Sequence, residues 1–215
     1  MLFHMPSTVP SRMGFILAGG KSSRMGVDKA FLDFGGQTLL DRALGVMGAV
    51  CERVAIIGDP ARFAKYEPAQ SGSAKYESVV ADIFSGCGPL AGIHAALLHS
   101  SAELNLMLAV DLPFVSKELL EFIFAAAAAD DNHAMITVPR VGKGFQPLCA
   151  VYRRDFSTTA EQALRAGKYK IDAAFSGVSI RIIDEAELAA AGFTEQSFFN
   201  VNTPQDRVAA EERGF

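Results

Sequence analysis

Residues 15–29 read FILAGGKSSRMGVDK, and the stretch changes character halfway along its length. It begins as a short apolar run, which is typical of a buried strand. Gly19 and Gly20 follow, and because they lack a Cβ the backbone can adopt positive φ there and bring N–H groups close to an anion. Three cations come within ten residues: Lys21, Arg24 and Lys29. The order of strand, glycines and cations predicts a loop that binds a triphosphate.

Two better-known phosphate motifs do not fit this stretch. The P-loop requires a glycine, four residues and then Gly-Lys-Ser; Gly20-Lys21-Ser22 is present, but Phe15 occupies the leading position. A P-loop lysine also opens a long helix, which Gly26 disfavours. The dinucleotide fingerprint G-x-G-x-x-G does not occur here either.

Length and composition limit the class of protein. The chain has 215 residues, of which 50% are hydrophobic and 20% charged, and this is typical of one globular domain. The formal net charge of −4 argues against nucleic-acid binding through a general basic surface. The three cysteines lack C-x-x-C spacing and indicate neither a zinc site nor a disulfide framework. We expect no membrane span, a cytoplasmic location, and a flexible N-terminal extension over residues 1–13 before a domain over residues 14–215.

Apolar periodicity predicts an α/β fold. The apolar run before the glycines, a helix over residues 38–50 with Thr38 as N-cap and a strand over residues 53–57 form a βαβ unit, which favours a parallel sheet. A helix is expected from Pro89 to about His99, and the continuous apolar residues 104–110 predict a central strand covered on both faces. Other helices are expected over residues 116–129, 155–166 and 186–191, and other strands over residues 134–138, 145–152 and 178–183. Residues 61–77 are polar and predict no regular element.

Asp111 comes directly after the predicted central strand. In open α/β sheets ligands lie beyond the carboxyl ends of the strands, so this carboxylate is expected in the ligand crevice. Mg²⁺ commonly binds one or two carboxylates together with phosphate oxygens and water, which makes Asp111 the candidate metal ligand. The alternative is that Asp111 only stabilises the turn before Leu112-Pro113 through side-chain hydrogen bonds.

Two other segments could line the same crevice. Residues 88–92, GPLAG, begin a helix whose free N–H groups could bind an anion or a base edge, although the glycines could instead only allow close packing on the sheet. Asn200 and Asn202 alternate with apolar residues and so share one face of an extended segment. They could point into the crevice or merely satisfy backbone groups.

The pattern L-A-G-G-x-S-x-R-M-G-x-D-K at residues 17–29 resembles the signature loop of the molybdenum cofactor guanylyltransferases, the MobA-type proteins of the sugar-nucleotidyltransferase superfamily. Three further blocks, at residues 88–92, 111–113 and 200–204, follow in the family's order. The resemblance implies a single Rossmann-like nucleotidyltransferase domain, with a mostly parallel twisted sheet and helices on both faces.

The same resemblance implies an activity and a set of site residues. The reaction would transfer GMP from GTP to the phosphate of molybdopterin or its molybdenum form and release pyrophosphate, with Mg²⁺ held by Asp111. Arg24 and Lys29 would bind the pyrophosphate, and Asn200 and Asn202 are candidates for the acceptor side. The residues expected to bind the nucleotide are Leu17, Ala18, Gly19, Gly20, Lys29, Asp82 and Asp111. Molybdoenzyme maturation proteins are candidate partners, and neither nucleic acid nor a membrane is expected.

Two alternatives remain open from the sequence. The first is a cytidylyltransferase acting on the same pterin or on another phosphorylated acceptor, although Leu-Ala-Gly-Gly rather than Leu-Ala-Ala-Gly favours guanine. The second is a noncatalytic nucleotide-binding adaptor, against which the joint presence of Arg24, Lys29 and Asp111 argues. The chain also departs from the family at Gly58-Asp59-Pro60, where an amide residue that helps to hold the nucleotide is often found.

Overall fold

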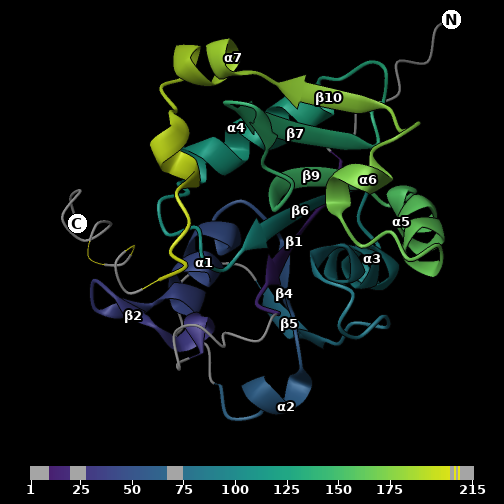
Figure 1. Ribbon diagram of the computed structural model, residues 1–215. Coiled ribbons are helices and arrows are strands. Elements are labelled where there is room, and N and C mark those ends of the chain that lie inside the picture. The colour runs from purple at the N-terminus through teal and green to yellow at the C-terminus, as the bar shows by residue number, and fades with distance from the viewer. Residues whose placement is uncertain (1–9, 20–27, 67–74, 204–205, 207, 209–215) are drawn as a thin grey trace, which may run out of the picture.

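One mixed sheet forms the centre of the computed structural model, which describes residues 10–19, 28–66, 75–203, 206 and 208 (Figure 1). Its strands are β1 (Arg12–Leu17), β4 (Arg53–Ile57), β5 (Lys75–Val80), β6 (Leu104–Ala109), β7 (Ile136–Val141), β8 (Gly144–Phe145), β9 (Cys149–Arg153) and β10 (Ile180–Ile183). They lie in the order β10-β7-β9-β6-β1-β4-β5, and β8 pairs with β7.

Most neighbouring strands in this sheet are parallel. β1 is parallel to both β4 and β6, β5 is parallel to β4, and β10 is parallel to β7. Only β8 and β9 pair with their neighbours in the antiparallel sense within the described part of this sheet. The predicted α/β fold with a mostly parallel sheet is therefore confirmed.

Helices cover both faces of the sheet, as predicted (Figure 1). The apolar sides of α1 (Leu39–Gly48) and α4 (Lys117–Ala128) pack on one face, together with η1 (Lys29–Phe31) and α7 (Glu185–Ala190). On the other face lie α3 (Pro89–His99), α5 (Phe156–Arg165) and α6 (Ile171–Ala174). Successive residues of β1 alternate between the two cores, since Ile16 joins the first while Phe15 and Leu17 join the second. Three short elements complete the described structure: the hairpin of β2 (Asp33–Phe34) and β3 (Gln37–Thr38), the helix α2 (Pro60–Phe63), and η2 (Glu195–Phe198).

The predicted helix starts agree with the caps in the structure. The Thr38 hydroxyl accepts a hydrogen bond of 3.0 Å from the Asp41 N–H, and the Ser116 hydroxyl accepts one of 3.3 Å from the Leu119 N–H. The helix expected from Pro89 spans Pro89–His99 and is preceded by Gly88 at φ 76°. This left-handed backbone conformation strongly favours glycine.

Several boundaries differ from the sequence-based expectation. β1 begins at Arg12, two residues before the expected start of the domain at residue 14, and residues 1–9 lie outside the described part. The strand expected over residues 145–152 is interrupted at Pro147, which has no N–H to donate to a neighbouring strand. β5 begins at Lys75, inside the segment predicted to be irregular. The sequence did not reveal the start of this edge strand, because its first residues are polar and show no apolar alternation. Within the described segments, no helix has the length and apolar character required to cross a membrane.

Replacement of Leu106 tests how much the central strand β6 contributes to the stability of the fold. Its side chain is 0% exposed and packs in the core beneath α1 and α4, so Leu106→Ala should lower the free energy of unfolding by about 2–5 kcal/mol. Leu98→Ala is the matched control, because Leu98 lies on the outer side of α3 with 47% exposure, and its loss should stay within about 0.5 kcal/mol. Urea unfolding of the ligand-free variants measures both, and equal losses would contradict the assigned core.

Candidate nucleotide-binding site

The strand order reverses between β1 and β6. From β1 the chain passes to β4 and β5 on one side, and it then returns to β6 on the other side of β1. Leu17 and Ala109 are partners in the parallel register, and the Leu17 carbonyl accepts a hydrogen bond of 3.2 Å from the Val110 N–H. The carboxyl ends of both strands therefore lie level, on the side toward which the β6 arrow points in Figure 1. Ligands of doubly wound sheets bind at such a reversal.

The carboxyl ends of these strands bring together three polar side chains: Lys29, Asp111 and Asn202. The Lys29 ammonium lies 2.6 Å from Asn202 Oδ1 and 3.3 Å from Asp111 Oδ2. The side chains of Lys29 and Asp111 are 23% and 22% exposed, so the ion pair is partly withdrawn from water but remains accessible to a ligand. Val201 donates its N–H to the Asp111 carbonyl at 2.9 Å, which holds the segment of Asn202 beside the end of β6.

Asp206 fixes the backbone around Asn202. Its Oδ2 atom accepts hydrogen bonds from the N–H groups of Asn202 and Thr203 at 2.9 and 2.8 Å, while its own N–H donates to Thr203 Oγ1 at 3.1 Å. These bonds, that of Asn202 foremost, lower the pKa of the Asp206 carboxyl. Asn200 is exposed on the same segment, and among the described residues no hydrogen bond joins it to the Lys29 cluster. Of the two asparagines expected on the acceptor side, Asn202 contacts Lys29.

Asp82 lies at the same edge, just beyond β5. Its Oδ1 atom is buried and makes no hydrogen bond with a described residue. A Cβ placed on Gly92 of α3 would lie 3.6 Å from this oxygen and 3.2 Å from side-chain atoms of both Leu17 and Ile57. The absence of a side chain at Gly92 therefore allows α3 to pack closely on β1 and β4, which is the structural role weighed for this glycine motif. Burial raises the pKa of the Asp82 carboxyl.

Leu17 ends β1, and Ala18 and Gly19 follow it at the same end of the sheet. The Ala18 N–H donates to the Ile57 carbonyl at 3.0 Å, and its carbonyl accepts from Arg62 Nη1 at 2.9 Å, so its backbone is hydrogen-bonded within the protein. Gly19 is exposed, and a Cβ built on it would meet no described atom within 4 Å. Gly20 and Arg24 lie outside the described residues.

Arg62 is a residue of this site that sequence analysis missed. It lies in α2, within the segment predicted to be irregular, and its guanidinium contacts both Ala18 and the carboxylate of Asp28. Asp59, within the Gly58-Asp59-Pro60 segment that departs from the family pattern, is the N-cap of the same helix and accepts a hydrogen bond of 2.9 Å from the Ala61 N–H. A charged pair between residues 34 positions apart has no local sequence signal.

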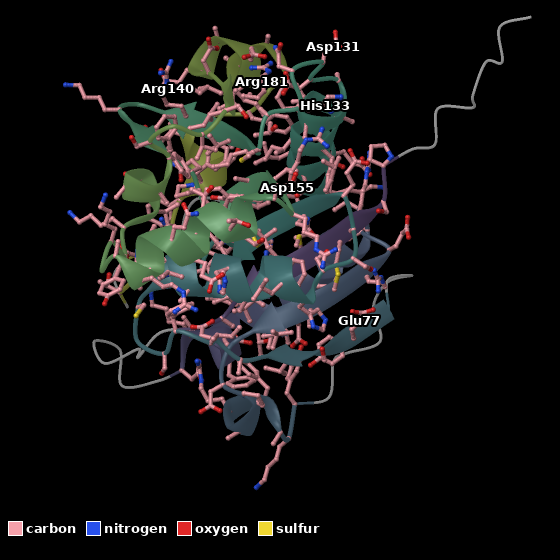
Figure 2. All side chains as sticks on the ribbon, turned by 90° about the vertical axis from the view of Figure 1, so that its right-hand side faces the viewer. Glu77, Asp131, His133, Arg140, Asp155 and Arg181 are labelled. Atoms are coloured by element: carbon pink, nitrogen blue, oxygen red, sulfur yellow. The ribbon has the colours of Figure 1, made fainter. Side chains whose placement is uncertain are left out.

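Charged residues also lie on the opposite side of the sheet, where the central strands begin. Figure 2 views the molecule from that side, with Glu77 toward the β5 edge and with Asp131, His133 and Arg181 toward β7 and β10. Glu77 pairs with Arg53 at 2.9 Å and lies 3.5 Å from His99, and Arg181 is paired with Glu187. In the described segments no cluster of three or more His, Cys, Asp and Glu side chains is suited to hold a metal ion.

A mostly parallel sheet with a lysine, a carboxylate and a glycine at its switch point defines the class of α/β nucleotide-binding domains. Known proteins of similar sequence show to which family within this class the chain belongs. The family model of the MobA-like NTP transferase domain matches residues 14–178. The chain belongs to this family, and it is a nucleotidyltransferase.

Individual relatives extend over nearly the whole chain. A protein of Pelotomaculum thermopropionicum named probable molybdenum cofactor guanylyltransferase is 38% identical over 197 residues, which cover 92% of this chain and 90% of that protein. The molybdenum cofactor guanylyltransferase of Desulfosudis oleivorans is 32% identical, with coverage of 92% and 93%. The crystal structure of molybdopterin-guanine dinucleotide biosynthesis protein A from Archaeoglobus fulgidus superposes with a TM-score of 0.77 at 25% identity, over 94% of this chain and 97% of the other.

The half-buried Asp82 carboxyl predicts a pH-dependent stability. Because burial raises its folded-state pKa, Asp82 makes the ligand-free protein less stable as the pH rises from the unfolded-state pKa of about 3.9 through the folded-state pKa. Asp82→Asn should therefore raise the melting temperature at pH 7, and this gain should vanish toward pH 4. The exposed Asp131 provides the control, since Asp131→Asn should change the melting temperature little at either pH. A gain that persists unchanged at pH 4 would contradict this assignment.

Proposed function

We propose that the protein transfers GMP from GTP to the phosphate of molybdopterin or of its molybdenum form and releases pyrophosphate. The observation that carries the proposal is the position of the Lys29 ammonium between Asp111 and Asn202, at the switch point of a nucleotidyltransferase fold. The choice of GTP and of the pterin acceptor is supported by the names of the relatives from P. thermopropionicum and D. oleivorans.

This reaction requires little covalent chemistry from the protein. An oxygen of the acceptor phosphate attacks the α-phosphorus of GTP, the bond from that phosphorus to the bridging oxygen breaks, and pyrophosphate leaves with the electron pair. The acceptor phosphate is already an anionic nucleophile, so no covalent enzyme intermediate is needed. The protein acts by holding the two substrates in line and by stabilising the charge that moves to the pyrophosphate.

In this proposal Lys29 interacts with the leaving pyrophosphate. Its ammonium is already fixed by Asp111 and Asn202, so it is preorganised before the substrate arrives. Phosphate oxygens of GTP then become additional partners of the same ammonium. Arg24, which lies outside the described residues, would add a planar fork for two further phosphate oxygens.

The Asp111 site fits Mg²⁺ bound jointly with a substrate. Mg²⁺ in nucleotide enzymes commonly takes one or two protein carboxylates and completes its shell with phosphate oxygens and water. Asp111 supplies one partly exposed carboxylate at the carboxyl end of β6, which agrees with that donor set. Once bound, the ion would neutralise negative charge on the triphosphate.

The nucleoside would lie between the end of β1 and the start of α3. Asp82 Oδ1 is a buried acceptor without a partner among the described residues, so a donor group of the ribose or of the base would satisfy it. Gly19 is exposed and carries no side chain, so the backbone beyond the end of β1 is left uncovered. Leu17 and Ala18 lie beside it.

Nucleotide-dependent stability tests the choice of base. With Mg²⁺ present, GTP at 100 times its dissociation constant should stabilise the native protein by about 2.7 kcal/mol, seen as a rise in melting temperature. CTP, ATP and UTP at the same concentration should give smaller shifts. A larger shift with CTP would replace guanylyl by cytidylyl transfer, and no shift with any nucleotide would refute the proposed function.

Two substitutions test the chemistry of the Lys29 cluster. Lys29→Ala and Asp111→Asn should each lower turnover by about 10²–10³-fold, because the first removes the cation that faces the leaving pyrophosphate and the second removes the negative charge of the proposed Mg²⁺ ligand. Turnover is measured as pyrophosphate release with GTP and molybdopterin, and circular dichroism verifies that each variant is folded. Lys117→Ala, at an exposed position on α4, is the control and should keep wild-type turnover. Near-wild-type rates in either site variant would remove that residue from the mechanism.

A further inference from the structure

We propose that Arg62 is a positioning residue, which places Lys29 by tying Asp28 to the end of β1. Arg62 Nε and Nη2 donate to the two carboxylate oxygens of Asp28 at 2.9 and 2.6 Å, and Nη1 donates to the Ala18 carbonyl at 2.9 Å. One planar guanidinium thus contacts two chain segments. Ala18 precedes the glycines and cations of the phosphate-binding sequence, and Asp28 is the residue directly before Lys29.

Asp28 transmits this contact to Lys29 through the backbone. Its Oδ1 atom also accepts a hydrogen bond of 3.1 Å from the Ala30 N–H, which caps η1. The Asp28 carbonyl accepts from the Phe31 N–H at 3.1 Å, so the same residue fixes the short helix at two points. Lys29 is the first residue of η1, and its ammonium therefore depends on where Asp28 is held.

Arg62 is itself held by rigid neighbours. Asp59 caps α2, and the Arg62 N–H donates to the Asp59 carbonyl at 3.0 Å. The next residue, Phe63, is buried in the core shared with α1, and the Arg62 guanidinium lies 5.2 Å from the centre of its ring. A fixed fork of this kind orients its carboxylate partner, whereas a lysine would offer a single flexible charge.

The charge balance also favours positioning over direct substrate binding. Three of the five N–H donors of the guanidinium are directed to protein atoms, two to Asp28 and one to Ala18. The Asp28 carboxylate neutralises its charge, and the two side chains are 27% and 29% exposed. Lys29 is exposed to a similar degree, 23%, and its partners Asp111 and Asn202 lie at the carboxyl ends of the central strands, where a ligand of the sheet would bind.

Hydrogen exchange of the ligand-free protein tests the anchoring itself. In Arg62→Ala, and in Asp28→Asn, which keeps an oxygen for the Ala30 N–H but loses the charge, amide exchange over residues 28–32 should become at least about tenfold faster. Exchange in β6 should not change, because the variants leave the central sheet intact. Unchanged exchange over residues 28–32 would overturn the proposal, whatever reaction the protein catalyses.

Kinetics tests the consequence for Lys29, and this part rests on the proposed function. Arg62→Ala should lower kcat for pyrophosphate release from GTP about tenfold to a hundredfold, with a smaller change in KM, because a displaced Lys29 loses contact mainly with the transition state. Arg62→Lys should lose most of the same activity, since one ammonium nitrogen cannot reproduce the spacing of the three guanidinium nitrogens that reach Ala18 and both Asp28 oxygens. Lys65→Ala is the matched control, as it removes an exposed cation three residues away and should leave kcat unchanged.

The variant Lys29→Ala separates positioning from a general structural effect. In that background Arg62→Ala should reduce the residual rate by less than about twofold, because its partner in the mechanism is already gone. An equal loss in both backgrounds, or wild-type activity in Arg62→Lys, would overturn the positioning role. If wild-type protein releases no pyrophosphate from GTP and molybdopterin, the proposed function fails instead, and hydrogen exchange alone decides whether Arg62 anchors Asp28.

Discussion

The ammonium of Lys29 lies between the Asp111 carboxylate and the Asn202 side-chain oxygen, and these contacts join chain segments 82 and 173 positions apart. The contact with Asp111 requires β6 to lie beside β1 in level register, because Asp111 follows β6. The contact with Asn202 requires the C-terminal segment to cross the ends of these strands, where the buried Val201 and its hydrogen bond to Asp111 hold it. The strand order and the path of the C-terminal segment thus together determine the partners of the Lys29 ammonium.

This ion pair contributes little to the stability of the fold. Partly exposed pairs are typically worth about 0–1 kcal/mol, since water screens them and the side chains lose entropy. The stability comes from the two apolar cores on the faces of the sheet. The charges at the strand ends are therefore free to serve a ligand, and a protein with a net charge of −4 concentrates cations where a polyanionic nucleotide would bind.

Local patterns in the sequence were sufficient to predict β1, α1, β4, α3, β6 and α4, because each shows an apolar run or a helical period, and most are bordered by a cap or a glycine. They also placed Asp111 at the crevice, since a residue after a buried parallel strand must lie at its carboxyl edge. They could not predict the direction of β9, the polar edge strand β5, or the choice of Asn202 over Asn200, which depend on contacts between distant segments. The role of Arg62 could not be predicted either, because nothing near it in sequence reveals its partner Asp28.

Asp82 and Arg62 represent two ways in which a binding site departs from the rules of a stable interior. Arg62 is a cation whose hydrogen bonds are directed to protein atoms, so its energy is used to hold the site in shape before a ligand arrives. Asp82 keeps a buried oxygen without a partner in the described structure, which lowers stability and leaves an acceptor for a ligand to satisfy. A site needs both kinds of residue, because a fixed frame gives specificity only when some polar groups are left for the substrate. Asp82 lies near Leu17 at the end of β1, and Arg62 contacts the next residue, Ala18. At this strand end the protein therefore keeps a destabilising polar group that a ligand can satisfy.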